Sequence, residues 1–207
     1  MFDGIIFDLD GTLWDATDMV AVAWEKVIND KTGLGIKISG DDLKRLFGRP
    51  LPVIIEALLP ELTKQQQEEV LEVCTQAEYD ELRINPGKLY DGLVDTLKVL
   101  SKKYKLFIVS NCQAGYIELF FEVTGLDKYF TDYECPGKSG LLKAANNRLI
   151  VERNALKNPV YVGDTMGDKE ASDEAGIPFI FASYGYGEVD NYYAKIESID
   201  ELQKILM

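Results

Sequence analysis

Polar side chains able to do chemistry follow three apolar stretches of the chain. They are Asp8–Thr12 (DLDGT), Ser110-Asn111 and Asp164–Asp168 (DTMGD). If the apolar stretches are neighbouring parallel strands, their carboxyl ends meet at one crevice, where open α/β sheets bind ligands. Carboxylates gathered there repel one another unless a cation joins them, and a site made only of oxygen ligands favours Mg²⁺. The pattern therefore predicts a magnesium site at which a phosphorylated molecule can bind.

The segments between these motifs predict the sheet that positions them. Short apolar runs, typical of buried strands, occupy residues 2–9, 106–109, 159–162 and 178–182, with Tyr129-Phe130 as a further short apolar element. Helix-like spacing occupies residues 91–103, 114–124, 142–154 and 167–175. Strands that alternate with helices form right-handed βαβ units. We therefore predict an α/β fold, a Rossmann-like parallel sheet with helices on both faces.

A second, all-helical unit is predicted between the first strand and the rest. Helix patterns cover residues 16–31, a stretch that begins at Ser39, and residues 63–83, and no convincing strand lies between residues 16 and 85. The Glu-rich part of the last helix is expected to be a solvated face, and Trp14 and Trp24 to pack between the two units. The predicted domains are a core of residues 1–15 and 86–207 and a helical insert of residues 16–85.

Composition excludes several classes of protein. The 207 residues are 46% hydrophobic, which is typical of a globular chain, and no apolar run is long enough to span a membrane. The net charge of −13 disfavours nucleic-acid partners. The chain has no histidine, which excludes Ser-His-Asp hydrolases and histidine-ligated zinc. Three cysteines without paired spacing, and a start that does not resemble a signal peptide, indicate a reducing cytoplasm.

The three motifs resemble those of a known superfamily. DLDGT, VSN (109–111) and GDTMGD (163–168) are similar to the first, second and fourth motifs of the haloacid dehalogenase superfamily and occur in the same order. The helical insert looks like the small cap of its phosphoglycolate-phosphatase-like and β-phosphoglucomutase-like branch. The resemblance implies a Mg²⁺-dependent phosphatase that hydrolyses a small soluble phosphomonoester through an aspartate nucleophile. The second aspartate of DLDGT indicates phosphoryl transfer, since the dehalogenases of the superfamily do not carry it.

The first two motifs contain residues suited to each step of such a reaction. Asp8 is expected to attack phosphorus, and Asp10 to act first as acid and then as base. Backbone N–H groups of Gly11 and Thr12 are expected to bind phosphoryl oxygens. Ser110 and Asn111 are expected to donate hydrogen bonds to the transferring group.

The remaining site residues are expected to hold the metal and to neutralise charge. Asp164 completes the metal site, which by resemblance also takes Asp8 and the carbonyl of Asp10, and Asp168 is expected to support it indirectly. The third motif is a lysine, either Lys143 or Lys138, and we favour Lys143 because a helix start positions a side chain better than a loop. Arg49, in the insert, resembles a substrate-binding arginine, although an exposed arginine in a turn is an equal alternative.

Two other functions compete with this interpretation. A phosphomutase on the same fold would return the phosphoryl group to a sugar, but such relatives use a histidine and a lysine near the insert, and this chain has no histidine. A phosphorylation-dependent signalling module also combines Asp, Mg²⁺ and Lys. It would have its phosphorylated aspartate on a central strand and no helical insert.

Overall fold

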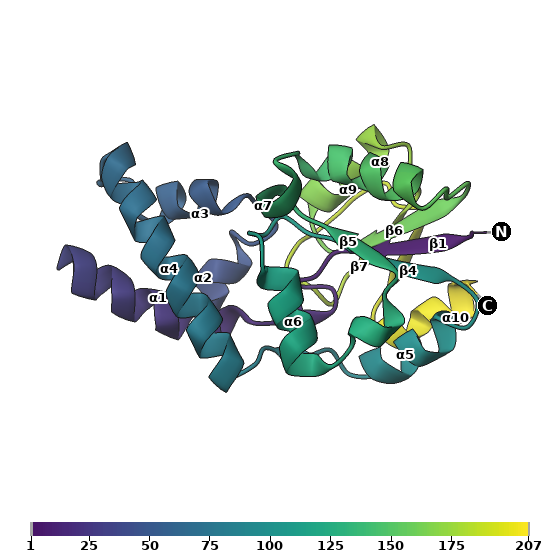
Figure 1. Cartoon of the computed structure of the whole chain (residues 1–207), viewed down its shortest axis with the longest axis horizontal. Coiled ribbons are helices and arrows are strands. Elements are labelled where there is room, and N and C mark those ends of the chain that lie inside the picture. Colours follow the sequence, from purple (N-terminus) through teal and green to yellow (C-terminus); the bar gives the residue numbers. More distant parts are fainter. Residues whose placement is uncertain (1, 207) are drawn as a thin grey trace.

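The computed structural model describes residues 2–206 and contains one six-stranded parallel sheet (Figure 1). The order of the strands across the sheet is β5-β4-β1-β6-β7-β8. Their bounds are β1 (Gly4–Phe7), β4 (Lys105–Val109), β5 (Asp132–Glu134), β6 (Pro159–Gly163), β7 (Phe179–Ala182) and β8 (Ala194–Ile196). This arrangement confirms the predicted fold class.

Strand β1 lies in the middle of the sheet and sets the register of the site. Phe7, its last residue, pairs with Ile108 of β4 and with Val162 of β6. The residues that follow these three strands therefore emerge side by side at the same edge of the sheet. The strands read as continuous apolar runs because both faces are buried: Ile5 and Phe7 pack into one hydrophobic cluster and Ile6 into another.

Helices cover both faces of the sheet, as predicted. Helices α8 and α9 lie on one face, and α5, α6 and α10 lie on the other (Figure 1). Their bounds are α5 (Leu93–Leu100), α6 (Tyr116–Thr124), α8 (Lys143–Arg153), α9 (Met166–Glu174) and α10 (Leu202–Leu206), with the short α7 (Pro136–Ser139) before α8. Helix α9 begins at a capping box. The Thr165 side chain accepts a hydrogen bond from the Asp168 backbone N–H, and the Asp168 side chain accepts one from the Thr165 N–H.

Four helices form the insert at the other end of the molecule (Figure 1). They are α1 (Thr17–Thr32), α2 (Gly40–Lys44), α3 (Leu51–Leu58) and α4 (Lys64–Ile84). Ser39 and Thr63 begin α2 and α4 with capping boxes, and Gly33 ends α1 in a left-handed conformation. Helix α1 packs along α4, and α4 also contacts α6 of the other part of the chain.

A short antiparallel ribbon joins the insert to the sheet part. Strand β2 (Trp14–Asp15) enters the insert and pairs with β3 (Lys88–Leu89), which leaves it. The Asp15 carboxylate accepts hydrogen bonds from the Thr17 N–H (3.0 Å) and from the Tyr186 hydroxyl (3.0 Å). It also pairs with Lys44 of α2 at 3.1 Å. The two segments that connect the insert to the sheet part are therefore held together beside the DLDGT motif.

Some elements differ from the sequence-based expectation. Tyr129-Phe130 is not a strand, because Tyr129 ends a 3₁₀ turn (Asp127–Tyr129) and the edge strand β5 follows it. Helix α3 and strands β2, β3, β5 and β8 were not expected. The missed strands are two or three residues long, so they have too few residues to show an apolar period.

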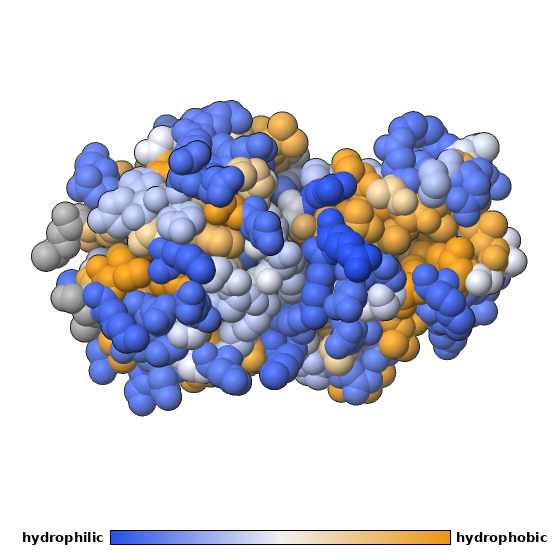
Figure 2. Space-filling model, turned by 180° about the vertical axis from the view of Figure 1, so that it is seen from behind, coloured by the Kyte–Doolittle hydropathy of each residue, from blue (hydrophilic) through white to orange (hydrophobic). Residues whose placement is uncertain are grey.

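Within residues 2–206, no helix combines the length and the hydropathy needed to cross a membrane. Figure 2 shows the face opposite to that of Figure 1, where hydrophilic side chains cover the junction between the insert and the sheet part. Apolar side chains are exposed toward both ends of this face.

Candidate active site

Asp8 lies directly after β1 and is paired with a buried lysine. The Asp8 residue is 1% exposed, and its Oδ1 accepts a hydrogen bond from Lys143 Nζ at 2.7 Å. Lys143, the first residue of α8, also forms an ion pair with Asp168. A single ammonium group therefore bridges the carboxylate that follows β1 and the carboxylate at the start of α9.

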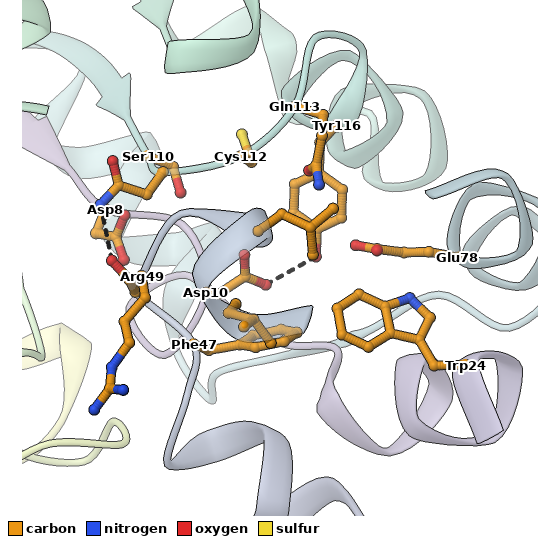
Figure 3. A pocket seen from close by; sticks show the side chains of 14 residues that line it. Asp8, Asp10, Trp24, Phe47, Arg49, Glu78, Ser110, Cys112, Gln113 and Tyr116 are labelled. Atoms are coloured by element: carbon orange, nitrogen blue, oxygen red, sulfur yellow. Dashed lines mark hydrogen bonds between the residues drawn. The ribbon is translucent and has the colours of Figure 1, made fainter. Parts of the chain in front are cut away.

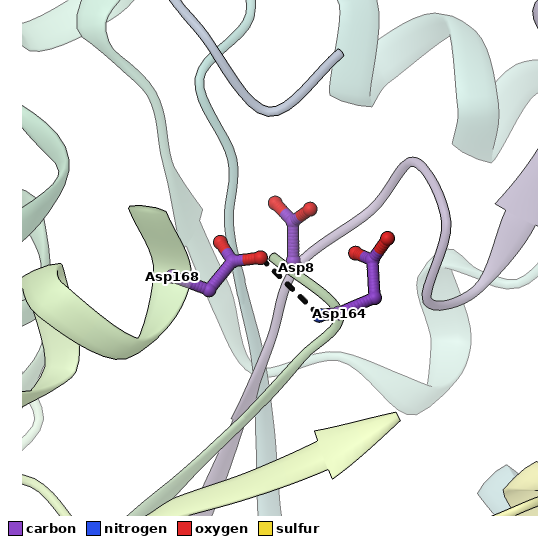
Figure 4. A group of neighbouring side chains, drawn as sticks. All are labelled: Asp8, Asp164 and Asp168. Atoms are coloured by element: carbon purple, nitrogen blue, oxygen red, sulfur yellow. Dashed lines mark hydrogen bonds between the residues drawn. The ribbon is translucent and has the colours of Figure 1, made fainter. Parts of the chain in front are cut away.

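Asp8, Asp164 and Asp168 form a buried carboxylate cluster at the carboxyl end of the sheet (Figure 4). One carboxylate oxygen of each lies within 4.8 Å of the others. Asp168 is already engaged, because its Oδ2 accepts hydrogen bonds from the N–H of Thr165 (2.9 Å) and of Asp164 (3.2 Å). Asp8 and Asp164 keep more of their oxygen lone pairs for a cation, which agrees with the indirect role expected for Asp168.

The electrostatics of the cluster fit a divalent cation. Burial and the charge of Asp168 raise the pKa of Asp8 to about 6, against the opposing effect of Lys143. Burial and the neighbouring carboxylates raise the pKa of Asp164 well above its usual range. Burial lowers the pKa of Lys143, but the negative charges of Asp168 and Asp8 outweigh the effect of burial. The pKa of Lys143 is therefore held well above its usual range. One lysine thus faces three carboxylates, and a bound Mg²⁺ would supply the missing positive charge.

Close packing around Asp164 fixes its position. The Thr12 hydroxyl donates to Asp164 Oδ1 at 3.2 Å, and the Tyr186 N–H donates to Oδ2 at 2.7 Å. Gly11 has φ +81°, and a Cβ there would lie 2.2 Å from Asp164 Oδ2. Position 11 therefore requires glycine both for its backbone conformation and for the space that the carboxylate occupies.

Asp10 lies in different surroundings from Asp8, although it follows only two residues later. Its Oδ1 accepts hydrogen bonds from Trp14 Nε1 and from the Tyr116 hydroxyl, each at 2.9 Å. Burial and the charge of Asp8 raise the pKa of Asp10 to about 7, and the two hydrogen bonds partly oppose this shift. A carboxyl group with a pKa near neutrality can both give and take a proton at physiological pH.

The two candidate lysines lie in different places. Lys143 is 4% exposed and contacts Asp8, whereas Lys138 is exposed on α7 and lies over the ring of Tyr133, 4.3 Å from its centroid. Only Lys143 is close enough to neutralise the Asp8 carboxylate.

Asn111 lines a pocket beside Asp8, whereas Gly11 and Thr12 do not, and the polar groups of all three already have partners (Figure 3). The Asn111 side-chain amide donates to the carbonyl of Gly48 at 2.8 Å, which ties the insert to the core. The N–H of Gly11 donates to the Trp14 carbonyl at 2.9 Å, and the N–H of Thr12 to the Leu9 carbonyl at 3.3 Å. In this conformation, therefore, the two N–H groups that we expected to bind phosphate donate hydrogen bonds to backbone carbonyls of the same turn.

Ser110 and Arg49 also line this pocket. Ser110 is 4% exposed and follows β4. Arg49 lies in the connection between α2 and α3, and its guanidinium group points away from Asp8 and Asp10 (Figure 3). Its side chain is exposed, so the geometry leaves both alternatives for Arg49 open.

Sequence reasoning missed several residues that line or support the site. Tyr116 and Glu78 lie on helices, and only the contact of α4 with α6 brings them to the pocket. Glu78 is 4% exposed, so the expectation of a fully solvated acidic face on this helix is wrong at that position. Trp14 and Trp24 are buried, as expected, but Trp14 also donates to Asp10. Trp14 follows Asp10 by four residues, and this spacing was the one local signal for the hydrogen bond between them.

A buried aspartate–lysine pair and two further carboxylates thus lie at the carboxyl edge of a parallel sheet, where open α/β folds bind ligands. The sequence of residues 5–182 matches the haloacid dehalogenase-like hydrolase family, and the chain belongs to that family. The resemblance of its motifs is thus confirmed, and the chain is a hydrolase of the phosphatase type.

Curated relatives and solved structures agree with this assignment. The chain is 28% identical over 193 residues to a phosphoglycolate phosphatase of Aquifex aeolicus, a match that covers 90% of this chain and 87% of the relative. It is 29% identical to a phosphoglycolate phosphatase of Agrobacterium fabrum, with 89% and 82% covered. Among solved structures, a haloacid dehalogenase-like family hydrolase from Streptococcus pneumoniae superposes with a TM-score of 0.87 at 19% identity, over 100% of this chain and 99% of that one. The last match supports the fold alone.

Proposed function

We propose that this chain is a Mg²⁺-dependent phosphatase that hydrolyses a small soluble phosphomonoester through an aspartyl-phosphate intermediate. The observation that carries the proposal is the contact of Lys143 with Asp8 inside a buried cluster of carboxylates. A carboxylate paired with an ammonium group stays ionised and can attack phosphorus, while the ammonium group offsets the charge of the incoming phosphate. Asp8, Asp164 and the backbone carbonyl of Asp10 are the proposed metal ligands, and the Mg²⁺ would neutralise the phosphoryl oxygens.

The proposed reaction has two steps with balanced proton transfers. In the first, an Asp8 oxygen forms a bond to phosphorus, the bond from phosphorus to the leaving oxygen breaks, and Asp10 gives that oxygen its proton. In the second, Asp10 takes a proton from water, the water oxygen attacks phosphorus, and the bond to Asp8 breaks. Inorganic phosphate leaves, and Asp8 is regenerated as a carboxylate. The hydrogen bonds from Trp14 and Tyr116 hold Asp10 in place for both transfers.

We further propose that residues 16–85 act as a cap over the site. Residues of the insert and of the core both line the pocket, and the hydrogen bond from Asn111 to Gly48 joins these two parts of the chain. A cap that closes in this way excludes bulk water and admits only small substrates.

The test is phosphatase activity with and without metal. We expect purified protein to hydrolyse p-nitrophenyl phosphate with Mg²⁺, and to lose this activity when EDTA removes the metal. Restoration by excess Mg²⁺ is the control for damage to the protein. Undiminished turnover in excess EDTA would contradict the proposed metal site, and the absence of hydrolysis of any phosphomonoester would contradict the proposed activity.

A further inference from the structure

The pocket between Asp8 and the insert has a far wall that the proposed reaction does not use. Its cavity volume is about 30 Å³, which corresponds to about two or three water molecules. Asp8 and Asp10 lie at one side, and Trp24 of α1 and Glu78 of α4 lie opposite them (Figure 3). Because phosphorus must be next to Asp8, the alcohol of the substrate must point toward Trp24 and Glu78.

Glu78 is a buried carboxyl group without a counter-ion. It is 4% exposed, and within residues 2–206 it takes part in no salt bridge. Its side chain points toward Asp10 and Tyr116 in the pocket (Figure 3). Burial and the charge of Asp10 raise its pKa to about 8. Leaving such a group without a strong partner is costly, so its retention in a substrate pocket points to a ligand.

Trp24, next to Glu78, provides a second indication of a ligand. The residue is 1% exposed, and within the described part of the chain its indole N–H has no hydrogen-bond partner of normal geometry. The indole lies close enough to Glu78 to oppose the rise in the pKa of that carboxyl group. A buried donor without a partner destabilises a protein by about 1–3 kcal/mol. A ligand atom that accepts a hydrogen bond would remove this penalty.

One functional group satisfies both residues. A hydroxyl group accepts a hydrogen bond from Trp24 and donates one to the Glu78 carboxylate, or accepts one from Glu78 when that group is protonated. An ammonium group leaves the Trp24 N–H without a partner. A carboxylate adds a further negative charge to a pocket that Asp8 and Asp10 already line.

We propose that Trp24 and Glu78 form a leaving-group subsite for a hydroxyl, so that the substrates are phosphomonoesters of diols or polyols rather than of hydroxy acids. This inference rests on the proposed phosphatase function and gives its substrate class. It separates the chain from the relatives named phosphoglycolate phosphatases, since glycolate carries a carboxylate at the corresponding position.

Four small phosphomonoesters with end groups of similar size test the subsite. They are 2-hydroxyethyl phosphate, propyl phosphate, O-phosphoethanolamine and 2-phosphoglycolate, which end in hydroxyl, methyl, ammonium and carboxylate groups. We expect kcat/KM to be highest for 2-hydroxyethyl phosphate, by about tenfold or more over propyl phosphate, because two hydrogen bonds of about 1 kcal/mol each distinguish them. Trp24→Phe and Glu78→Gln should each reduce this hydroxyl-to-methyl ratio by at least about threefold.

The control variant is Glu72→Gln, on the exposed side of the same helix, which should leave the ratio unchanged. The inference is overturned if the wild-type protein shows no preference for hydroxyl over methyl, if it prefers the carboxylate or the ammonium compound, or if both subsite variants keep the wild-type ratio. Hydrolysis of p-nitrophenyl phosphate in the same preparations reports separately on the phosphatase function. A wrong substrate class is therefore distinguishable from a wrong activity.

Discussion

Two aspartates of one short motif have different surroundings and therefore different expected tasks. Asp8 contacts Lys143, which favours its charged form. Asp10 accepts hydrogen bonds from Trp14 and Tyr116, and its pKa is raised to about 7. Asp8 thus has a positively charged partner that Asp10 lacks, which fits an ionised nucleophile next to an acid–base group.

The first prediction concerns these two aspartates. Asp8→Asn should abolish turnover, because the amide has no charged oxygen with which to attack phosphorus. The Asp10→Asn protein should still attack substrates with good leaving groups, but breakdown of its intermediate should slow by about 10²–10⁴-fold, because no base activates water. Rapid-quench kinetics should then show a burst of p-nitrophenol, and mass spectrometry a phosphoryl group on Asp8.

Circular dichroism of both variants is the control for correct folding. Wild-type turnover by Asp8→Asn, or the absence of any adduct on Asp8 in the Asp10→Asn protein, would contradict covalent catalysis by Asp8.

The second prediction concerns the two lysines. Lys143→Ala should lower kcat by about 10²-fold or more, since Lys143 contacts Asp8 and offsets charge in the transition state. Lys138→Ala is the matched control and should change kcat little, because its side chain lies over Tyr133 and away from the pocket. Steady-state kinetics with p-nitrophenyl phosphate would measure both. The opposite result would place the third motif at Lys138.

At the scale of elements, the connection between α2 and α3 closes the pocket. Gly48 has φ +86°, and a Cβ there would lie 3.0 Å from Thr165 of the core. The Gly48 carbonyl accepts a hydrogen bond from the side-chain amide of Asn111. The connection is thus fitted closely against the sheet part, and its next residue, Arg49, lies at the rim of the pocket.

The third prediction tests whether Arg49 contacts the substrate. If the connection adjusts when a substrate binds, Arg49→Ala should raise KM for 2-hydroxyethyl phosphate several-fold while kcat changes little, because contacts made equally in the ground and transition states act on KM. KM for p-nitrophenyl phosphate should rise less. Arg45→Ala, an exposed arginine paired with Asp42, is the control. Equal effects of Arg49→Ala on both substrates would make Arg49 an ordinary surface residue.

At the scale of the whole molecule, the net charge of −13 includes a cluster of carboxylates that folding brings together. The pKa values of Asp8 and Asp10 rise on folding from 3.8 to about 6 and about 7. Between about pH 4 and 7 the native protein therefore binds more protons than the unfolded chain. Its free energy of unfolding must then fall as the pH rises through this range.

The fourth prediction follows from this linkage. In EDTA, Tm should be lower at pH 8 than at pH 5.5, and Mg²⁺ should raise Tm more at pH 8, where the ligands are deprotonated. A change of 1 kcal/mol shifts Tm by about 2–4 °C in a chain of this size, so thermal unfolding can resolve it. Glu78→Gln should weaken the pH dependence, because the amide that replaces the carboxyl group does not titrate. A metal-free Tm that rises from pH 5.5 to 8 would contradict the raised pKa values.

The amino-acid sequence by itself determined which polar residues lie at the carboxyl edge of the sheet. Apolar runs that end in Asp8, Ser110 and Asp164 need only local information, since a buried parallel strand is apolar throughout and its first polar residue marks its end. The capping residues Ser39 and Thr63 marked helix starts for the same reason.

Only the tertiary structure decided which side chains meet around those motifs. Glu78 lies at four-residue spacing from Cys74 and Leu82 on the buried face of α4, but a carboxyl group is expected in water, and only the packing of α4 against α1 and α6 shows that it is buried. The contact of Tyr116 with Asp10 spans 106 positions of sequence, and that of Lys143 with Asp8 spans 135. Secondary structure follows from interactions between near neighbours, whereas hydration, charge pairing and pKa depend on what the folded chain brings together.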